Sequence, residues 1–380
     1  MNFKLLEEFL DQITEWRIPG ADCAVYYKNK PVFRHRSGYA DIQSKKPVTA
    51  DTLYYLYSTS KVITCAAALQ LFEKGKFLMS DPVWEYLPEF REMYIQRHRE
   101  NGEAERVKAV NSINVRDLFM MTAGLTYDLN TPSIQAAKDE TQGRCPTREI
   151  VKAIAKDPLR FEPGTHWNYS LCHDVLGGLV EVVSGRNFGR YLQENIFEPL
   201  EMKDTGFHPS EERKRRMATQ YNFDEETKTV REEGLTNVFV LGSEYESGGA
   251  GLVSSVDDYM KFANALCNHG KAPNGEQILC KHTIELMKTN HLNGALLEDF
   301  NWIQMVGYGY GLGVRTMIDK AKGGSLSPAG EFGWPGAAGA YALIDQENEL
   351  SVFYAQHMLN SQEPYVHPRL RNIVYNCLEA

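Results

Sequence analysis

The stretch TLYYLYSTSKVITCAAALQLF, residues 52–72, contains a single charged side chain, Lys61. Ser58 lies three residues before Lys61, so in a helix the hydroxyl and the amine lie one turn apart on one face. From Val62 onward apolar residues recur nearly all round the helix, which predicts a buried helix that ends near Gly75. Burial disfavours the charged form of a lysine, so we expect Lys61 to act as a base and Ser58 to be the nucleophile that it activates.

This Ser-x-x-Lys spacing also has a purely structural interpretation. Serine is a favoured helix cap, and such a tetrad arises about once by chance in a chain of this length and composition. Ser58 or Ser60 would then cap the helix, and the stem of Lys61 would lead its amine to water. Other parts of the chain have to decide between the two interpretations.

The composition indicates a globular protein with a small-molecule substrate. The chain has 380 residues, 43% hydrophobic and 24% charged, enough for one large domain or two joined lobes. A formal net charge of −9 argues against nucleic-acid or anionic-membrane partners, which need clustered Lys and Arg. Residues 1–20 resemble an amphipathic helix more than a signal peptide, and no apolar run would span a bilayer. We therefore expect a cytoplasmic protein, of an oligomeric state that the sequence leaves unknown.

Cysteine and histidine spacing predicts neither a metal site nor a redox site. The seven cysteines include no Cys-x-x-Cys pair, and their odd number fits reduced thiols. The ten histidines show no ligand spacing. We therefore expect no metal and no cofactor.

The order of the periodic segments predicts an α+β fold. Strand-like segments at 21–27 and 31–41 flank a polar tip, and a second pair at 338–345 and 349–357 precedes a helix from about 365 to 378. Helical periodicity dominates the middle of the chain, at 62–74, 114–121, 147–156, 171–184, 188–196 and 255–268. This order predicts an antiparallel sheet that pairs the two chain ends and is flanked by terminal helices, with an inserted, mostly helical lobe.

The expected boundaries follow from this order. An α/β lobe would comprise residues 1–57 and 305–380, and the helical lobe residues 58–304, with the active site in the cleft between them. Two polar stretches, 91–112 and 211–234, have mixed charge and are expected to be exposed excursions from the helical lobe.

A second proton-handling group is expected at Tyr169. No serine lies in a Gly-x-Ser-x-Gly frame, which excludes an α/β-hydrolase. In FEPGTHWNYSLCHDVLGGLVEVVSG (161–185), Tyr169 lies between a Pro-Gly turn and a strong helix. A phenol beside an ammonium has its ionised form stabilised, so Tyr169 and Lys61 could share one proton and act as the base. The structural alternative is a half-buried tyrosine that bridges turn and helix.

Six blocks, which span nearly the whole chain, carry a family resemblance: 37–61, INVRDLFMMTAGLTYD (113–128), 161–178, SGGAGLVSSVDDYMKFANAL (247–266), YGYGLGV (308–314) and FGWPGAAGAYALID (332–345). The chain resembles the serine β-lactamase and penicillin-recognising enzyme superfamily, in the branch of class C β-lactamases and family VIII carboxylesterases. The resemblance implies a β-lactamase/transpeptidase-like fold. It also implies that Ser58 is acylated, that Lys61 and Tyr169 are the base pair, and that the backbone N–H groups of Ser58 and Ala337 form the oxyanion hole.

The departures from that family pattern indicate an esterase. Where β-lactamases of this branch carry Tyr-x-Asn, this chain has Leu171 in place of the asparagine, and Asp174-Val-Leu-Gly follows as in the esterase members. Where Lys-Thr-Gly supplies a cation for a substrate carboxylate, the chain has Trp334-Pro-Gly, so a carboxylate-bearing substrate is disfavoured. Leu171 and Trp334 are expected to form an apolar acyl pocket, and the expected substrate-binding set is Leu171, Trp334, Gly336 and Ala338.

We therefore expect a serine hydrolase that cleaves small neutral esters through an acyl-enzyme on Ser58. Acyl transfer to another alcohol or amine shares the same intermediate. Weak β-lactamase or D-amino-acid peptidase activity is a further alternative. A relative that binds ligands without turnover is an alternative of a different class.

Overall fold

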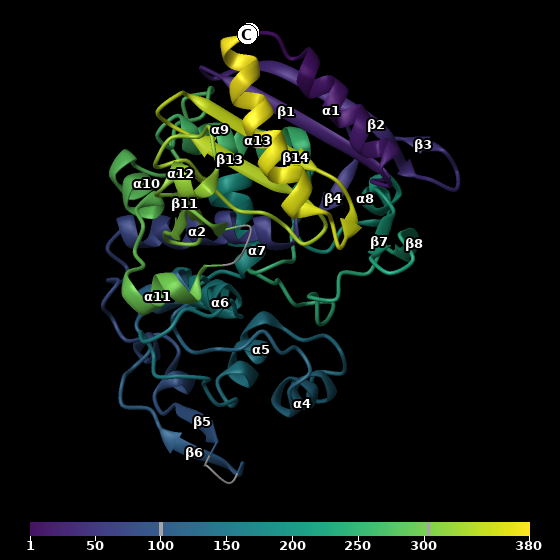
Figure 1. The fold of residues 1–380 in the computed structure, drawn as a ribbon. Helices are drawn as coiled ribbons and strands as arrows, with labels where there is room; N and C mark the ends of the chain where they lie inside the picture. Colours follow the sequence, from purple (N-terminus) through teal and green to yellow (C-terminus); the bar gives the residue numbers. More distant parts are fainter. Residues whose placement is uncertain (99–101, 302–304) are drawn as a thin grey trace.

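The computed structural model describes residues 1–98, 102–301 and 305–380 (Figure 1). Its centre is an antiparallel eight-stranded sheet with the order β10-β11-β12-β13-β14-β1-β2-β3. The hairpins expected near each terminus are present: β1 (Gly20–Tyr27) with β2 (Lys30–Asp41), and β13 (Tyr341–Asp345) with β14 (Leu350–Ala355). The strands β1 and β14 pair with each other, so the two chain ends meet in the middle of the sheet. The remaining strands of this sheet are β3 (Lys46–Pro47), β10 (Tyr308–Tyr310), β11 (Arg315–Met317) and β12 (Phe332–Gly333).

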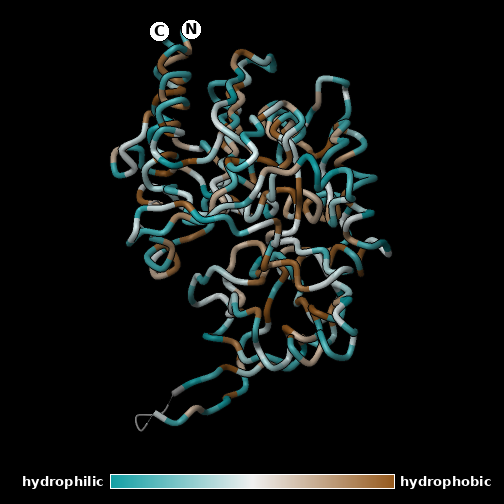
Figure 2. Tube along the Cα trace, turned by 90° about the vertical axis from the view of Figure 1, so that its right-hand side faces the viewer, coloured by the Kyte–Doolittle hydropathy of each residue, from teal (hydrophilic) through white to brown (hydrophobic). Residues whose placement is uncertain are grey.

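Helices cover both faces of this sheet. Successive side chains of β14 point to opposite faces, and Val352 and Tyr354 lie in one apolar core with the terminal helices α1 (Lys4–Glu15) and α13 (Glu363–Glu379). Phe353 points the other way and stacks on Tyr259 of α9 (Val256–Cys267), with ring centroids 4.0 Å apart. The two chain termini lie side by side at the top of Figure 2, beyond these layers.

The helical lobe is built around α2 (Ser60–Glu73), which packs against α6 (Cys172–Ser184). All residues of α2 from Ser60 to Leu71 are buried, as the apolar pattern predicts. The other helices of the middle of the chain are α3 (Val115–Met120), α4 (Pro132–Glu140), α5 (Thr147–Ile154), α7 (Phe188–Leu192), α8 (Glu211–Arg216), α10 (Lys281–Lys288) and α11 (Gly294–Asp299), and α12 (Lys320–Gly323) follows. The helical segments expected from periodicity are thus present, with ends shifted by a few residues.

The two polar stretches differ in structure. The first forms a hairpin of β5 (Tyr94–His98) and β6 (Ala104–Lys108), which extends away from the helical lobe in Figure 2. The second contains β7 (Gln220–Asp224) and β8 (Thr229–Gly234), and it is not simply an exposed excursion. The strand β7 pairs with β15 (Met358–Leu359), and this pairing buries Tyr221 and Phe223 in the core beneath the terminal helices.

The architecture confirms the predicted α+β class. The proposed division at residues 58 and 305 remains a proposal, because α9 from the inserted part covers one face of the sheet and β9 (Val253–Ser255) pairs with β4 (Leu53–Tyr55). Within the described residues, none of the helices combines the length and the apolar character needed to cross a bilayer.

Candidate active site

Ser58 lies at the junction between β4 and α2. A single 3-10 turn, Tyr57–Thr59, connects the two elements, and Tyr57 has a φ of +47°, in the left-handed region that non-glycine residues seldom adopt. Two side chains hold the turn: the Tyr57 hydroxyl donates a hydrogen bond to Gln220, and the Thr59 hydroxyl donates to the Leu56 carbonyl at 2.8 Å. The partly buried Ser58 side chain therefore begins from a fixed backbone.

Lys61 is fully buried, with 0% of its surface exposed. Its Nζ donates hydrogen bonds to Ser58 Oγ at 3.3 Å, to the Tyr127 hydroxyl at 3.2 Å and to the Gly249 carbonyl at 2.7 Å. The amine therefore does not follow its stem to water, and the structural interpretation of the Ser-x-x-Lys spacing is wrong for Lys61. The predicted placement of hydroxyl and amine one turn apart is confirmed.

Tyr169 packs its ring against the lysine amine. Lys61 Nζ lies 4.5 Å from the centroid of this ring. Tyr127 and Trp334 stack with it, at centroid distances of 5.4 Å and 5.7 Å and interplanar angles of 16° and 19°. The indole N–H of Trp334 donates a hydrogen bond to the Tyr169 hydroxyl at 3.2 Å. The structure thus brings Ser58, Lys61 and Tyr169 into one cluster.

Tyr127 belongs to this cluster although the sequence did not single it out. It lies beyond α3, and its hydroxyl accepts the hydrogen bond from Lys61. Burial raises the pKa of Tyr127 well above its usual range, so this phenol stays neutral. It lies inside a block that carries the family resemblance, but no local spacing connects it with Lys61, 66 residues earlier in the chain.

The turn that contains Ala337 lies against the segment that precedes Ser58. A Cβ at Gly336 would lie 2.3 Å from the Leu56 carbonyl oxygen, so the close approach needs a glycine at this position. The Gly336 N–H donates to the Ala340 carbonyl at 2.7 Å, and the Gly339 N–H to the Gly336 carbonyl at 2.8 Å. This turn exposes Ala337 and buries Gly336 and Ala338.

The side chains expected to form the acyl pocket face the interior. Leu171 is 3% exposed and packs in the core that includes the helical lobe, while Trp334 is 2% exposed and Ala338 is 0% exposed. Trp334 reaches the site through its hydrogen bond to Tyr169. These side chains therefore have little exposed surface, and their role in substrate binding stays a prediction.

Phe239 packs its aromatic ring against the cluster. Its half-buried ring meets Tyr57 edge-on at 5.8 Å and Tyr127 edge-on at 5.5 Å. Sequence reasoning missed it because it follows a polar stretch and precedes no recognisable helix or strand. The only local signal was the apolar character of residues 238–241 in an otherwise polar region.

The loop that carries Phe239 is anchored on both sides. The Tyr55 hydroxyl donates to the Leu235 carbonyl at 3.0 Å, and the buried Asn237 amide donates to the Ala250 carbonyl at 2.8 Å. The Asn237 Oδ1 in turn accepts the Phe239 N–H at 3.0 Å. The loop therefore holds the Phe239 ring in place, although its neighbour Val238 is 62% exposed.

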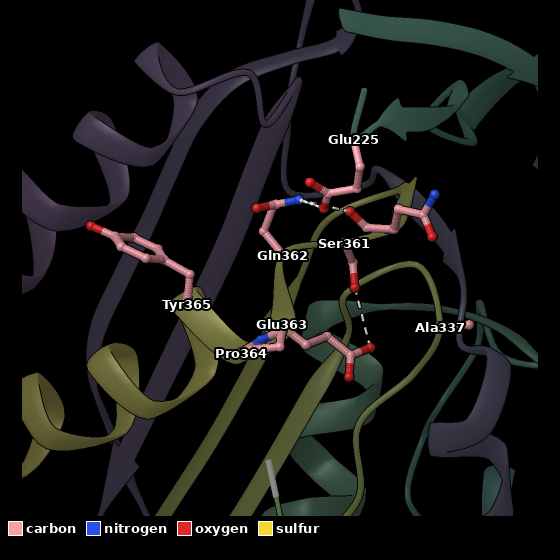
Figure 3. A pocket seen from close by; sticks show the side chains of 8 residues that line it. Glu225, Ala337, Ser361, Gln362, Glu363, Pro364 and Tyr365 are labelled. Carbon is pink, nitrogen blue, oxygen red and sulfur yellow. Dashed lines mark hydrogen bonds between the residues drawn. The ribbon is translucent and has the colours of Figure 1, made fainter. Parts of the chain in front are cut away.

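A cavity of about 390 Å³ opens beside Ala337 (Figure 3). Its walls include two carboxylates, Glu225 and Glu363, and Figure 3 shows Tyr365 pointing away from Ala337. Gln362 Nε2 donates to Glu225 at 2.9 Å, and burial raises the pKa of Glu363 to about 7. The cavity therefore places acidic side chains near Ala337. Its full lining is Glu225, Ala337, Asn360, Ser361, Gln362, Glu363, Pro364 and Tyr365.

Known proteins are similar to this chain over most of its length. The family profile described as Beta-lactamase matches residues 4–375. The chain belongs to the beta-lactamase family. Protein Rv1367c of Mycobacterium tuberculosis (strain ATCC 25618 / H37Rv) is 30% identical over 347 residues, which cover 89% of this chain and 85% of that protein. Esterase EstB of Burkholderia gladioli is 28% identical over 371 residues, which cover 91% of this chain and 88% of EstB.

A solved structure of an enzyme is also similar to this chain. EstCE1, described as a hydrolase with promiscuous acyltransferase activity, superposes with a TM-score of 0.76 at 25% identity, covering 98% of each chain. The superfamily and the fold predicted from the six sequence blocks are therefore confirmed, with esterases among the relatives. Membership of the beta-lactamase family together with these esterase relatives indicates a serine hydrolase.

Proposed function

We propose that this member of the beta-lactamase family is a carboxylesterase that cleaves small neutral esters through an acyl-enzyme on Ser58. The observation that carries the proposal is the buried amine of Lys61, which donates to Ser58 Oγ at 3.3 Å and lies over the Tyr169 ring at 4.5 Å. A serine hydroxyl is a weak nucleophile until a neighbouring base takes its proton. The contact between Ser58 and Lys61, and the Tyr169 ring packed on that amine, support the assignment of this base to the cluster.

Within this base pair, we assign the resting proton to Lys61. Its three acceptors match the three N–H bonds of an ammonium, and two aromatic faces, Tyr127 at 5.3 Å and Tyr169 at 4.5 Å, favour a cation. With the shared proton on Lys61, the Tyr169 oxygen holds the negative charge at rest and is the atom that takes the serine proton. The Trp334 N–H, aimed at this oxygen, stabilises that charge before the transfer.

The reaction follows from these assignments. Ser58 Oγ bonds to the ester carbonyl carbon while its proton moves to the Tyr169 oxygen, and the N–H groups of Ser58 and Ala337 stabilise the resulting oxyanion. The bond between the carbonyl carbon and the alcohol oxygen then breaks, and the same proton passes to the departing alcohol. Water attacks the acyl carbon in the second half, the base pair takes a proton from it, and Ser58 leaves with that proton.

The surroundings favour a neutral substrate. Trp334 occupies the position where the resemblance places a carboxylate-binding lysine, so no cation is supplied there. Glu225 lines the cavity beside Ala337 and would repel a substrate carboxylate. Phe239 offers an aromatic wall for an apolar group. A neutral ester with one apolar part fits these features better than a penicillin or a peptide carboxylate.

Acyl transfer is a second candidate function because the acyl-enzyme is the same. The support for it is EstCE1, which is described as having promiscuous acyltransferase activity. Product analysis with an added alcohol or amine separates the two functions: transfer yields a new ester or amide, whereas hydrolysis yields the free acid.

The test is hydrolysis of a chain-length series of p-nitrophenyl esters by the wild type and by Ser58→Ala, purified in parallel. We expect activity in the wild type that is lost in Ser58→Ala, and covalent labelling of Ser58 by a fluorophosphonate probe. Equal rates in both proteins would overturn the mechanism. A kcat/KM that is flat from about pH 5 to 10 would overturn the assignment of the base pair. Labelling of Ser58 without turnover would indicate a relative that binds ligands but does not hydrolyse them. Turnover of a chromogenic cephalosporin would indicate a β-lactamase.

A further inference from the structure

Asp174 is a buried carboxylate for which the mechanism above has no role. It lies in the first turn of α6 and is 1% exposed. Its Oδ1 accepts hydrogen bonds from the Tyr245 hydroxyl at 2.8 Å, the Ser247 hydroxyl at 2.7 Å and the Gly249 N–H at 3.4 Å. Its Oδ2 is buried and has no hydrogen-bond partner among the described residues. Burying a carboxylate in this way is costly unless a positive charge compensates it.

The peptide segment at Gly249 connects this carboxylate with the lysine of the site. The Gly249 N–H points to Asp174, and the Gly249 carbonyl accepts the Lys61 amine at 2.7 Å, the shortest of the three bonds to this amine. A Cβ at Gly249 would lie 2.5 Å from Asp174 Oδ2 and 3.3 Å from the Tyr127 hydroxyl. The backbone can therefore lie between carboxylate and amine only because this residue has no side chain.

Three titratable side chains near Lys61 are held neutral. Burial and the nearby Lys61 charge lower the pKa of His173 to about 3, and burial raises the pKa of Cys65 well above its usual range. Burial likewise keeps the pKa of Tyr127 high, and the charge of Asp174 contributes to this effect. Asp174 is thus a buried carboxyl group that lies across the Gly249 peptide from the lysine.

We propose that Asp174 is the counter-charge of Lys61 and the residue that positions the lysine amine, acting through the Gly249 peptide. The inference rests on the proposed function, because it assumes that Lys61 remains an ammonium while Tyr169 takes and returns the serine proton. Asp174 acts through the Gly249 peptide and not as the base. Its charge stabilises the ammonium, and its hydrogen bonds to Tyr245, Ser247 and Gly249 fix the loop whose carbonyl holds the amine.

The variant Asp174→Asn separates charge from shape. The asparagine Oδ1 can still accept the same three hydrogen bonds, whereas the negative charge is lost. We expect kcat for p-nitrophenyl acetate to fall by about 10- to 1,000-fold with little change in KM, as for the loss of an electrostatic contact that acts in the transition state. Labelling of Ser58 by the fluorophosphonate probe should slow by a similar factor.

Glu246→Gln is the matched control. Glu246 is a partly buried carboxylate on the same loop, but it accepts the Gly189 N–H at 2.7 Å and does not contact the site. We expect Glu246→Gln to keep the wild-type kcat. Tyr245→Phe and Ser247→Ala each remove one donor to Asp174 and leave its charge in place, so each should lower kcat by less than Asp174→Asn does.

The outcomes distinguish this inference from the proposed function. A wild type that shows neither turnover nor labelling contradicts the proposed function itself. An active wild type with an equally active, folded Asp174→Asn contradicts the role of Asp174 alone. Circular dichroism shows whether Asp174→Asn folds. If it does not fold, Tyr245→Phe and Ser247→Ala provide the test. A wild-type kcat in both of these variants would contradict the role of Asp174.

Discussion

The indole N–H of Trp334 donates a hydrogen bond to the Tyr169 hydroxyl at 3.2 Å, and the two rings stack with centroids 5.7 Å apart. The family resemblance places a lysine where Trp334 stands in this chain. The tryptophan keeps a donor at the phenol oxygen but brings no charge that would bind a substrate carboxylate. Trp334 in place of this lysine thus supports the proposed base and also favours neutral substrates.

Replacing Trp334 by Phe should lower kcat. The change keeps an aromatic ring and removes the donor to Tyr169, so we expect a loss of about 10-fold or more, the equivalent of roughly 1.5 kcal/mol for a hydrogen bond to a charged group. Steady-state kinetics with a neutral p-nitrophenyl ester provides the measurement. A double-mutant cycle is the control: in a Tyr169→Phe background, Trp334→Phe should have no further effect on kcat. Independent, additive effects would show that Trp334 acts by another route.

Replacing Phe239 by Ala should change the substrate preference. The ring lies edge-on against Tyr57 and Tyr127, so its loss removes an apolar contact worth about 1–3 kcal/mol to a bulky ester and little to an acetate. We expect kcat/KM to fall by about 10-fold for octanoate and benzoate esters and by less than about 3-fold for acetate. Val110→Ala, 89% exposed and outside the site, is the control. An equal loss for every ester would exclude Phe239 as a specificity residue.

Glu363 should make stability fall as pH rises. Burial raises its pKa from 4.5 to about 7, so the folded state holds this proton more tightly than the unfolded state does. The stabilisation is complete below pH 4.5 and is lost as pH rises through 7. Urea unfolding at pH 5 and pH 8 should show a larger loss in the wild type than in Glu363→Gln, by about 1–3 kcal/mol. Glu298 is exposed, so Glu298→Gln should lose as much unfolding free energy between pH 5 and pH 8 as the wild type does. If Glu363→Gln also loses as much as the wild type, the prediction is wrong.

His173 should destabilise the protein in acid. Its pKa falls to about 3 on folding from 6.5, so only the unfolded chain takes up a proton between these values, and the free energy of unfolding decreases as pH falls from 6.5. The raised pKa of Asp22, about 6, and that of Glu363 act in the opposite direction. The comparison of His173→Gln with the wild type isolates the histidine. From pH 6.5 to 4.5 the variant should lose about 2 kcal/mol less stability than the wild type. Parallel curves would contradict this assignment.

Local pattern predicted most of the elements. Alternation identified both terminal hairpins, and the apolar run after Lys61 identified α2, because these periods depend only on which face of each element is buried. The exposed status of residues 211–234 was predicted less well. Tyr221 and Phe223 are buried because β7 pairs with β15, more than a hundred residues later in the chain. The amino-acid composition of residues 211–234 does not predict this pairing of strands.

In the candidate site, too, some residues were predictable from local spacing, whereas the positions of others depend on the tertiary structure. Ser58 and Lys61 lie on one helical turn, so their spacing alone brought hydroxyl and amine together. Leu171 is buried, and its predicted contact with the substrate stays a prediction. Tyr127 and Phe239 reach the site from separate loops, and their positions depend on packing against residues far away in the chain.

The sequence by itself therefore determined the family and the α+β fold, and it predicted the Ser58, Lys61 and Tyr169 set, because these are carried by residue types at fixed spacings in blocks along the chain. Only the tertiary structure decided how the lysine is held: three acceptors from separate segments surround it, and Asp174 lies beyond the Gly249 peptide. Such an environment depends on the distances between segments that the fold brings together. No local period or spacing encodes those distances.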